Sequence, residues 1–145
     1  MKKFLVVVTV ASLLFAGHAV SAQKGAPKTY DSARLQATYA EYNESFFNNS
    51  LPKNTTVQWA DIPMTADDHF LMGVTHENFE NATFKIDIDT KSNITWVTAD
   101  TTLLHEMCHV KTTKFAREHD QDLHGPAFKA CIVDLEMQGA FTDLL

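Results

Sequence analysis

The sequence has few cysteines and few basic residues, and both shortages exclude classes of protein. Its two cysteines, Cys108 and Cys131, form no Cys-x-x-Cys pair, so a zinc ribbon cannot be built. The 12 lysine and arginine residues are outnumbered by 18 acidic residues, and they form no long basic run. Because an acidic chain repels phosphate backbones, we do not expect nucleic acid as a partner.

Long apolar runs are also scarce, and the clearest one lies near the N-terminus. It extends over 13 residues from Phe4 to Ala16, fewer than the roughly 20 that a membrane-spanning helix requires. A short basic start precedes it and the small residues Val20-Ser21-Ala22 follow it, which predicts a secretory signal peptide over residues 1–22. We therefore expect an exported protein, periplasmic or extracellular, without a stable membrane anchor.

The rest of the chain is long enough for one domain and no more. Residues 23–29 include Gly25 and Pro27 and are expected to form a flexible lead, and residues 30–145 a single domain. No internal repeat or low-complexity segment indicates a second domain. Without the two lysines of the predicted signal peptide, 10 basic and 18 acidic residues remain, which gives a net charge of −8.

Three amphipathic stretches predict helices. The first, Tyr30–Phe47, has an aromatic and aliphatic stripe at helical spacing. The second, Val97–Arg117, has two apolar stripes, so we expect a central helix that is packed on most sides. The third, Ala127–Gly139, follows Pro126, a residue that suits the first turn of a helix.

Three stretches between the first two helices predict strands: Thr55–Ala60, Phe70–Thr75 and Thr83–Asp89. In the second strand, Phe70, Met72 and Val74 are expected to share one face. The expected core face of the third is Phe84, Ile86 and Ile88, with the residues between them facing water. The pattern predicts an α+β fold in which helices pack on a small antiparallel sheet of about three strands. If the third strand lies at the sheet edge, it could bind substrate by strand addition.

The predicted central helix contains the sequence His-Glu-x-x-His at residues 105–109. In a helix, His105 and His109 lie on one face with Cβ atoms about 5–6 Å apart, close enough to hold one metal ion. Glu106 lies roughly 100° round the helix, where it can reach a water on the metal without being a ligand. Two imidazoles, a carboxylate base and an open coordination position are what metal-assisted hydrolysis requires.

A catalytic zinc ion needs a third protein ligand, and three residues compete for that position. Our first choice is His124, which follows His109 by 15 residues, where a polar loop can fold the last helix back. His119 and Glu136 are the alternatives. The residue six positions after His109 is Phe115, which excludes the histidine spacing of the metzincins.

The sequence leaves several other roles open. Cys108 and Cys131 could form a disulfide, as an even count in an exported protein invites, or could be two buried small residues. The second donor to an oxyanion could be His69, His76, His119 or a tyrosine. Five Asn-x-Ser/Thr sites could carry glycans in a eukaryotic secretory pathway, or could reflect a threonine-rich composition. Nothing in the sequence determines the oligomeric state.

Taken in order, these segments resemble the SprT-like zinc metallopeptidase family. Leu103–His109 matches its Leu-Leu-His-Glu-x-Cys-His pattern, and His124–Phe128 matches its His-Gly-x-x-Phe pattern. Softer similarities are the Leu-Pro exit from the first helix at residues 51–52 and the tryptophan, Trp59, of the first strand. The likeness extends over roughly residues 31–137. It implies a zincin-like fold, with His105, His109 and His124 as ligands of one zinc ion and Glu106 as the catalytic base.

The motif and the resemblance together predict a zinc metalloendopeptidase that hydrolyses peptide bonds in a protein or peptide substrate. The alternative is a catalytically silent metal-binding or interaction module on the same fold. An intact Glu106 favours the enzyme, because a silent module has no use for it.

Overall fold

The computed structural model describes residues 30–65, 71–142 and 144. The predicted signal peptide and flexible lead therefore lie outside the described residues. The chain forms α1 (Ser32–Phe47), β1 (Thr56–Ala60), β2 (Gly73–Asn78), β3 (Thr83–Asp89), α2 (Trp96–Glu118) and α3 (Pro126–Met137). The α+β class is confirmed, and each predicted element is present.

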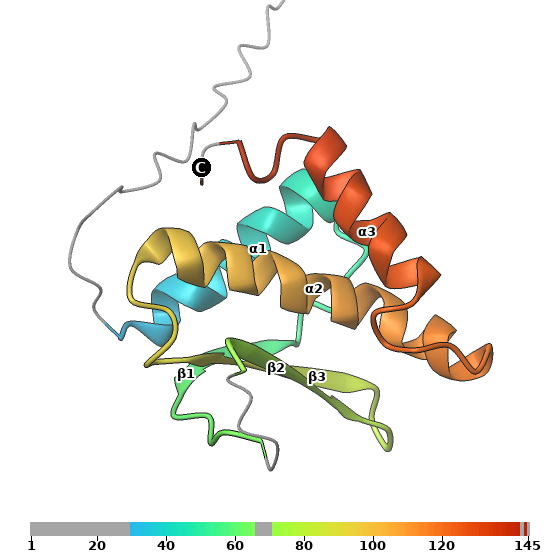
Figure 1. Cartoon of the computed structure of the whole chain (residues 1–145), viewed down its shortest axis with the longest axis horizontal. Coiled ribbons are helices and arrows are strands. Elements are labelled where there is room, and N and C mark those ends of the chain that lie inside the picture. The colour runs from blue at the N-terminus through green and yellow to red at the C-terminus, as the bar shows by residue number, and fades with distance from the viewer. Residues whose placement is uncertain (1–29, 66–70, 143, 145) are drawn as a thin grey trace, which may run out of the picture.

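The helices lie on one side of the sheet (Figure 1). α2 packs across β2 and β3, α1 packs against β1 and α2, and α3 packs against α2 (Figure 1). The core between these layers is formed by apolar side chains that are fully buried, among them Leu35, Tyr39, Ile86, Ile88, Leu103, Leu104 and Met107. Among the described residues, no helix combines the length and the apolar character needed to cross a membrane.

The sheet is mixed, with the strand order β1-β3-β2. β2 pairs with β3 in the antiparallel sense, as predicted, but β1 pairs with β3 in the parallel sense. The prediction of a wholly antiparallel sheet was wrong for β1. The connection from β1 to β3 includes β2 and is long enough to return the chain to the same end of the sheet, so β3 runs in the same direction as β1. Since β3 is the central strand, its edges are paired and it cannot accept a substrate strand. β2 is an edge strand instead.

β2 begins three residues later than predicted and turns its other face to α2. Gly73 lies opposite Ile88 and Thr75 lies opposite Ile86, so these small and polar residues share the face of the core isoleucines. Met72, on the apolar face of the predicted strand, precedes β2 and is 44% exposed, and Phe70 lies outside the described residues. The apolar alternation misled the prediction because the face of β2 that packs on α2 carries small residues, which leave space for the Glu106 side chain.

The outer face of β3 was predicted to face water, but only its first half does: Lys85 is exposed, whereas the two aspartates that follow are not. Asp87 and Asp89 are both buried. The Asp89 carboxylate accepts hydrogen bonds from the backbone N–H groups of Ile62, Lys91 and Ser92. These bonds compensate for burying the charge.

Asp100 of α2 is a second buried carboxyl group, and it lies toward α1. Burial raises the pKa of Asp100 to about 6, although the Arg34 guanidinium opposes the shift. Arg34 is itself held over the Trp96 ring, with Cζ 3.5 Å from the ring centroid. A carboxyl group with a raised pKa stabilises the fold fully below its unfolded pKa, and this contribution is lost as pH rises through the folded pKa.

We predict that Asp100→Asn raises the free energy of unfolding at pH 8, by up to about 3 kcal/mol, because the buried charge is removed. The gain should shrink below pH 6 and vanish near pH 4, where the wild-type carboxyl is also neutral in the folded state. Urea unfolding from pH 4 to pH 8 measures this difference. The exposed Asp134→Asn is the control and should change little. An Asp100→Asn variant that is no more stable than wild type at pH 8 would contradict the prediction.

Candidate metal centre

Residues 105–109 lie within α2, as predicted. His105 and His109 are one turn apart, and their ring centroids are separated by 5.0 Å. A capping box fixes the start of the helix, since Thr95 and Thr98 each accept the other's backbone N–H with their side chains. The helix is therefore anchored at its start, and the two imidazoles project from one face.

The loop between α2 and α3 carries His124. Asp122 holds this loop in a turn, because its carboxylate accepts the His124 N–H at 2.7 Å and its carbonyl accepts the Gly125 N–H at 2.8 Å. A Cβ on Gly125 would lie 2.7 Å from that carbonyl oxygen, so the turn requires glycine. His124 Nε2 consequently lies 3.1 Å from His109 Nε2 and 3.3 Å from His105 Nε2.

The other two residues considered as a third ligand lie elsewhere. His119 stacks on Phe115 with ring centroids 3.9 Å apart, and its Nδ1 lies 2.9 Å from the Phe115 carbonyl oxygen. Glu136 is exposed on α3. Within the described part of the chain, the group able to hold a metal ion consists of His105, His109 and His124.

The spacing of the three imidazoles and the lowered pKa values of two of them fit a zinc ion. A tetrahedral zinc ion with bonds of about 2.0–2.1 Å holds its ligand nitrogens about 3.3 Å apart, close to the two Nε2 separations of His124. Burial lowers the pKa of His105, and burial with the neighbouring imidazoles lowers the pKa of His109 to about 4. These two rings are therefore neutral at neutral pH, which is the form that binds a metal.

Phe128 of α3 supports all three rings. Its ring centroid lies 4.8 Å from that of His105, 4.5 Å from that of His109 and 4.7 Å from that of His124. The buried His109 Nδ1 has no hydrogen-bond partner among the residues that the structure describes. Stacking on Phe128, rather than a hydrogen bond to a carboxylate, therefore sets the orientation of this ring.

A sequence model of the SprT-like family matches residues 35–142, which include both the histidine cluster and the sheet. The chain belongs to the SprT-like family. No curated protein matches the sequence significantly. The family match and the three-histidine cluster together indicate a site like that of a zinc metallopeptidase.

A disulfide joins the two helices that flank the SprT-like histidine cluster. It links Cys108 of α2 to Cys131 of α3, with Cα atoms 5.8 Å apart, and so decides between the two alternatives that the sequence left open. Because Cys108 adjoins His109 and α3 follows His124, the bridge holds the ligand-bearing segments together. Closing a loop with a sequence separation of 23 contributes about 3 kcal/mol in the chain-entropy account. The disulfide hints at an oxidising compartment.

Glu106 of this SprT-like chain is held by the edge strand β2. Its carboxylate Oε2 accepts the Thr75 hydroxyl at 2.7 Å. A Cβ on Gly73 would lie 2.9 Å from Glu106 Oε1 and 2.8 Å from Thr102 Cγ2, so Gly73 makes the space that the carboxylate occupies. Burial raises the pKa of Glu106 to about 7, opposed by the hydrogen bond from Thr75. A carboxyl with this pKa can exchange a proton near neutral pH.

Sequence reasoning missed the roles of Gly73 and Thr75. A glycine inside a strand pattern is a signal of close backbone approach, and it would have identified Gly73. Among the residues proposed for the oxyanion, those that the structure describes lie away from the site. His76 Nε2 instead lies 3.1 Å from Asp87 Oδ2 on the outer face of the sheet. His69 lies outside the described residues, and the tyrosines and His119 do not line the cleft described next.

The histidines and Glu106 open into a cleft of about 880 Å³. Its walls come from β2 and the residues next to its two ends, from α2 between Val97 and Thr113, from the loop that carries His124, and from Leu144. The cleft therefore extends along α2 past the histidine cluster and is large enough to take several residues of an extended chain.

We predict that His124→Ala weakens zinc binding by more than about a hundredfold. Losing a residue that only hydrogen-bonds to a metal ligand weakens binding by up to about that factor, and His124→Ala would remove a ligand itself. The matched control is His119→Ala, which removes a nearby imidazole outside the cluster and should leave the zinc affinity unchanged. Competition against a chromogenic chelator measures both affinities. Equal zinc affinity in wild type and His124→Ala would show that His124 is not a ligand.

Proposed function

We propose that the protein is an exported zinc metalloendopeptidase that cleaves extended protein or peptide substrates. The observation that carries this proposal is the convergence of His105, His109 and His124 beside the buried carboxylate of Glu106. The disulfide supports an oxidising location, and a periplasmic or extracellular site would agree with the predicted signal peptide.

The chemistry divides between the metal and the protein. Zinc bound by the three imidazoles would supply a Lewis acid for a substrate carbonyl and a water molecule. Glu106 would accept the proton of the attacking water and pass it to the leaving amine. The Thr75 hydroxyl, bound to Oε2, would keep the carboxylate oriented through both transfers.

β2 offers a way to hold the substrate. It is an edge strand, and its residues line the cleft next to Glu106. An extended peptide could pair with its backbone, which would align the scissile bond with the histidines independently of side-chain identity. This role replaces the strand addition considered for residues 83–89, which lie at the centre of the sheet.

We predict that Glu106→Gln keeps zinc but lowers casein hydrolysis by at least about a hundredfold, because the general base is lost while the imidazoles remain. The control is Glu118→Gln, the same change at the C-terminal end of α2, where activity should be retained. Zinc content by elemental analysis and cleavage with and without a chelator are the measurements. Full activity in Glu106→Gln would exclude the proposed mechanism, and no chelator-sensitive activity in zinc-loaded wild type would favour the silent module.

A further inference from the structure

The lining of the cleft is apolar beyond the histidine cluster. We propose that the cleft selects polypeptide segments whose side chains next to the scissile bond are uncharged and apolar. This inference rests on the proposed function for its occupant, an extended peptide, and adds the class of sequence that is accepted. Four of the large hydrophobic residues exposed among the described residues line the cleft: Leu71, Met72, Phe79 and Leu123. Covering them with an apolar ligand would remove this surface from water.

The threonines of the cleft also present an apolar surface. Their hydroxyls are already engaged: Thr98 Oγ1 donates to the Thr95 carbonyl, Thr101 Oγ1 to the Val97 carbonyl, Thr102 Oγ1 to Asn93 Oδ1 and Thr113 Oγ1 to the His109 carbonyl. The bond distances lie between 2.7 and 2.9 Å. A ligand in the cleft therefore meets threonine methyl groups rather than free donors.

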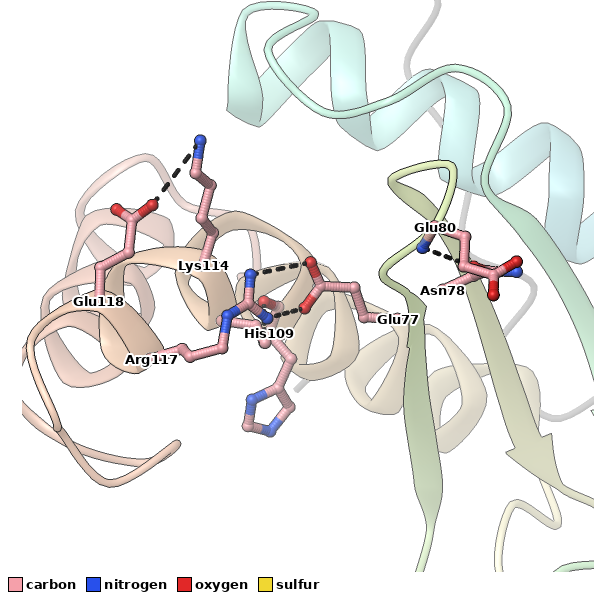
Figure 2. A network of polar contacts seen from close by, with 8 residues as sticks. Glu77, Asn78, Glu80, His109, Lys114, Arg117 and Glu118 are labelled. Atoms are coloured by element: carbon pink, nitrogen blue, oxygen red, sulfur yellow. Dashed lines mark hydrogen bonds and ion pairs between the residues drawn. The ribbon is translucent and has the colours of Figure 1, made fainter.

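Charge is nearly absent from the cleft, although the chain as a whole is acidic. In the described lining there is no lysine, arginine or aspartate, and the carboxylates are those of Glu77 and Glu106. Glu77 is neutralised by Arg117, which reaches from the end of α2 to β2 with a two-pronged contact at 2.5 and 3.3 Å (Figure 2). Arg117 also lies over the Phe79 ring, with Cζ 4.7 Å from the centroid. The ion pair therefore removes the net charge that Glu77 would bring to this end of the cleft.

Selectivity follows from how a peptide would lie along β2. Alternate side chains of an extended strand point to the same side, so every second residue would enter the cleft. A lysine or glutamate there would lose water without gaining a partner, whereas a leucine would bury its side chain against the lining. Glu77 would attract a basic side chain only if Arg117 no longer neutralised it.

Peptide binding tests this inference without requiring turnover. The protein is the zinc-loaded Glu106→Gln variant, and the ligands are fluorescent Gly/Ser peptides with leucine, lysine or glutamate at three alternate central positions. Fluorescence anisotropy should show the leucine peptide bound at least about tenfold more tightly than either charged peptide. Leu123→Ser should weaken leucine-peptide binding, and Ile94→Ser should not, because Ile94 is also exposed but lies outside the cleft. Equal affinities for the three peptides, or no binding of any, would overturn the proposal.

The ion pair provides the sharper test. In the same background, Arg117→Met should raise affinity for the lysine peptide relative to the leucine peptide by about threefold, the effect of a partly exposed ion pair. The double variant Glu77→Gln/Arg117→Met should restore the original order, because both charges are gone. An Arg117→Met variant with unchanged preference would show that the pair does not set selectivity. If the leucine preference holds but zinc-loaded wild type cleaves none of the peptides, the selectivity stands and the peptidase function fails.

Discussion

Three imidazole nitrogens converge on one point, and the elements around them are arranged to hold them there. His124 Nε2 lies 3.1 Å from His109 Nε2 and 3.3 Å from His105 Nε2, so each of these ring nitrogens has another ring nitrogen as its neighbour. A cation bound between the three rings would use these nitrogens as ligands. Three features keep His124 close to the two histidines of α2: the turn at Asp122, the stack on Phe128 and the disulfide between α2 and α3.

β2 connects this cluster to the cleft. Through Gly73 and Thr75 it makes space for the Glu106 carboxylate and holds it, and through Glu77 it binds the end of α2. Because the same strand is an edge of the sheet, it would align a substrate against the group that acts on it. The residues that orient the acid, Gly73 and Thr75, and the glutamate proposed to influence selectivity, Glu77, thus lie on one face of a single strand of six residues.

Much of the site could be predicted from the sequence because its determinants are local. The spacing of His105 and His109 is a helix turn, and the loop before Pro126 placed His124 at the start of α3, where the structure has it. The face of β2 could not be read in this way. The apolar alternation at Met72 and Val74 suggests one face, but the inner face is set by the buried carboxylate of Glu106, which needs the space at Gly73 and lies more than thirty residues away in the sequence. The parallel pairing of β1 is likewise set by chain crossing, not by strand composition.

X-ray absorption spectroscopy of the zinc-loaded protein is the decisive experiment for the three-histidine centre, because it reports the identity and distance of the atoms bound to the metal. We expect three imidazole nitrogens at about 2.0–2.1 Å, with an oxygen atom as the fourth ligand. Fewer than three imidazoles, or a sulfur atom at about 2.3 Å, would contradict it.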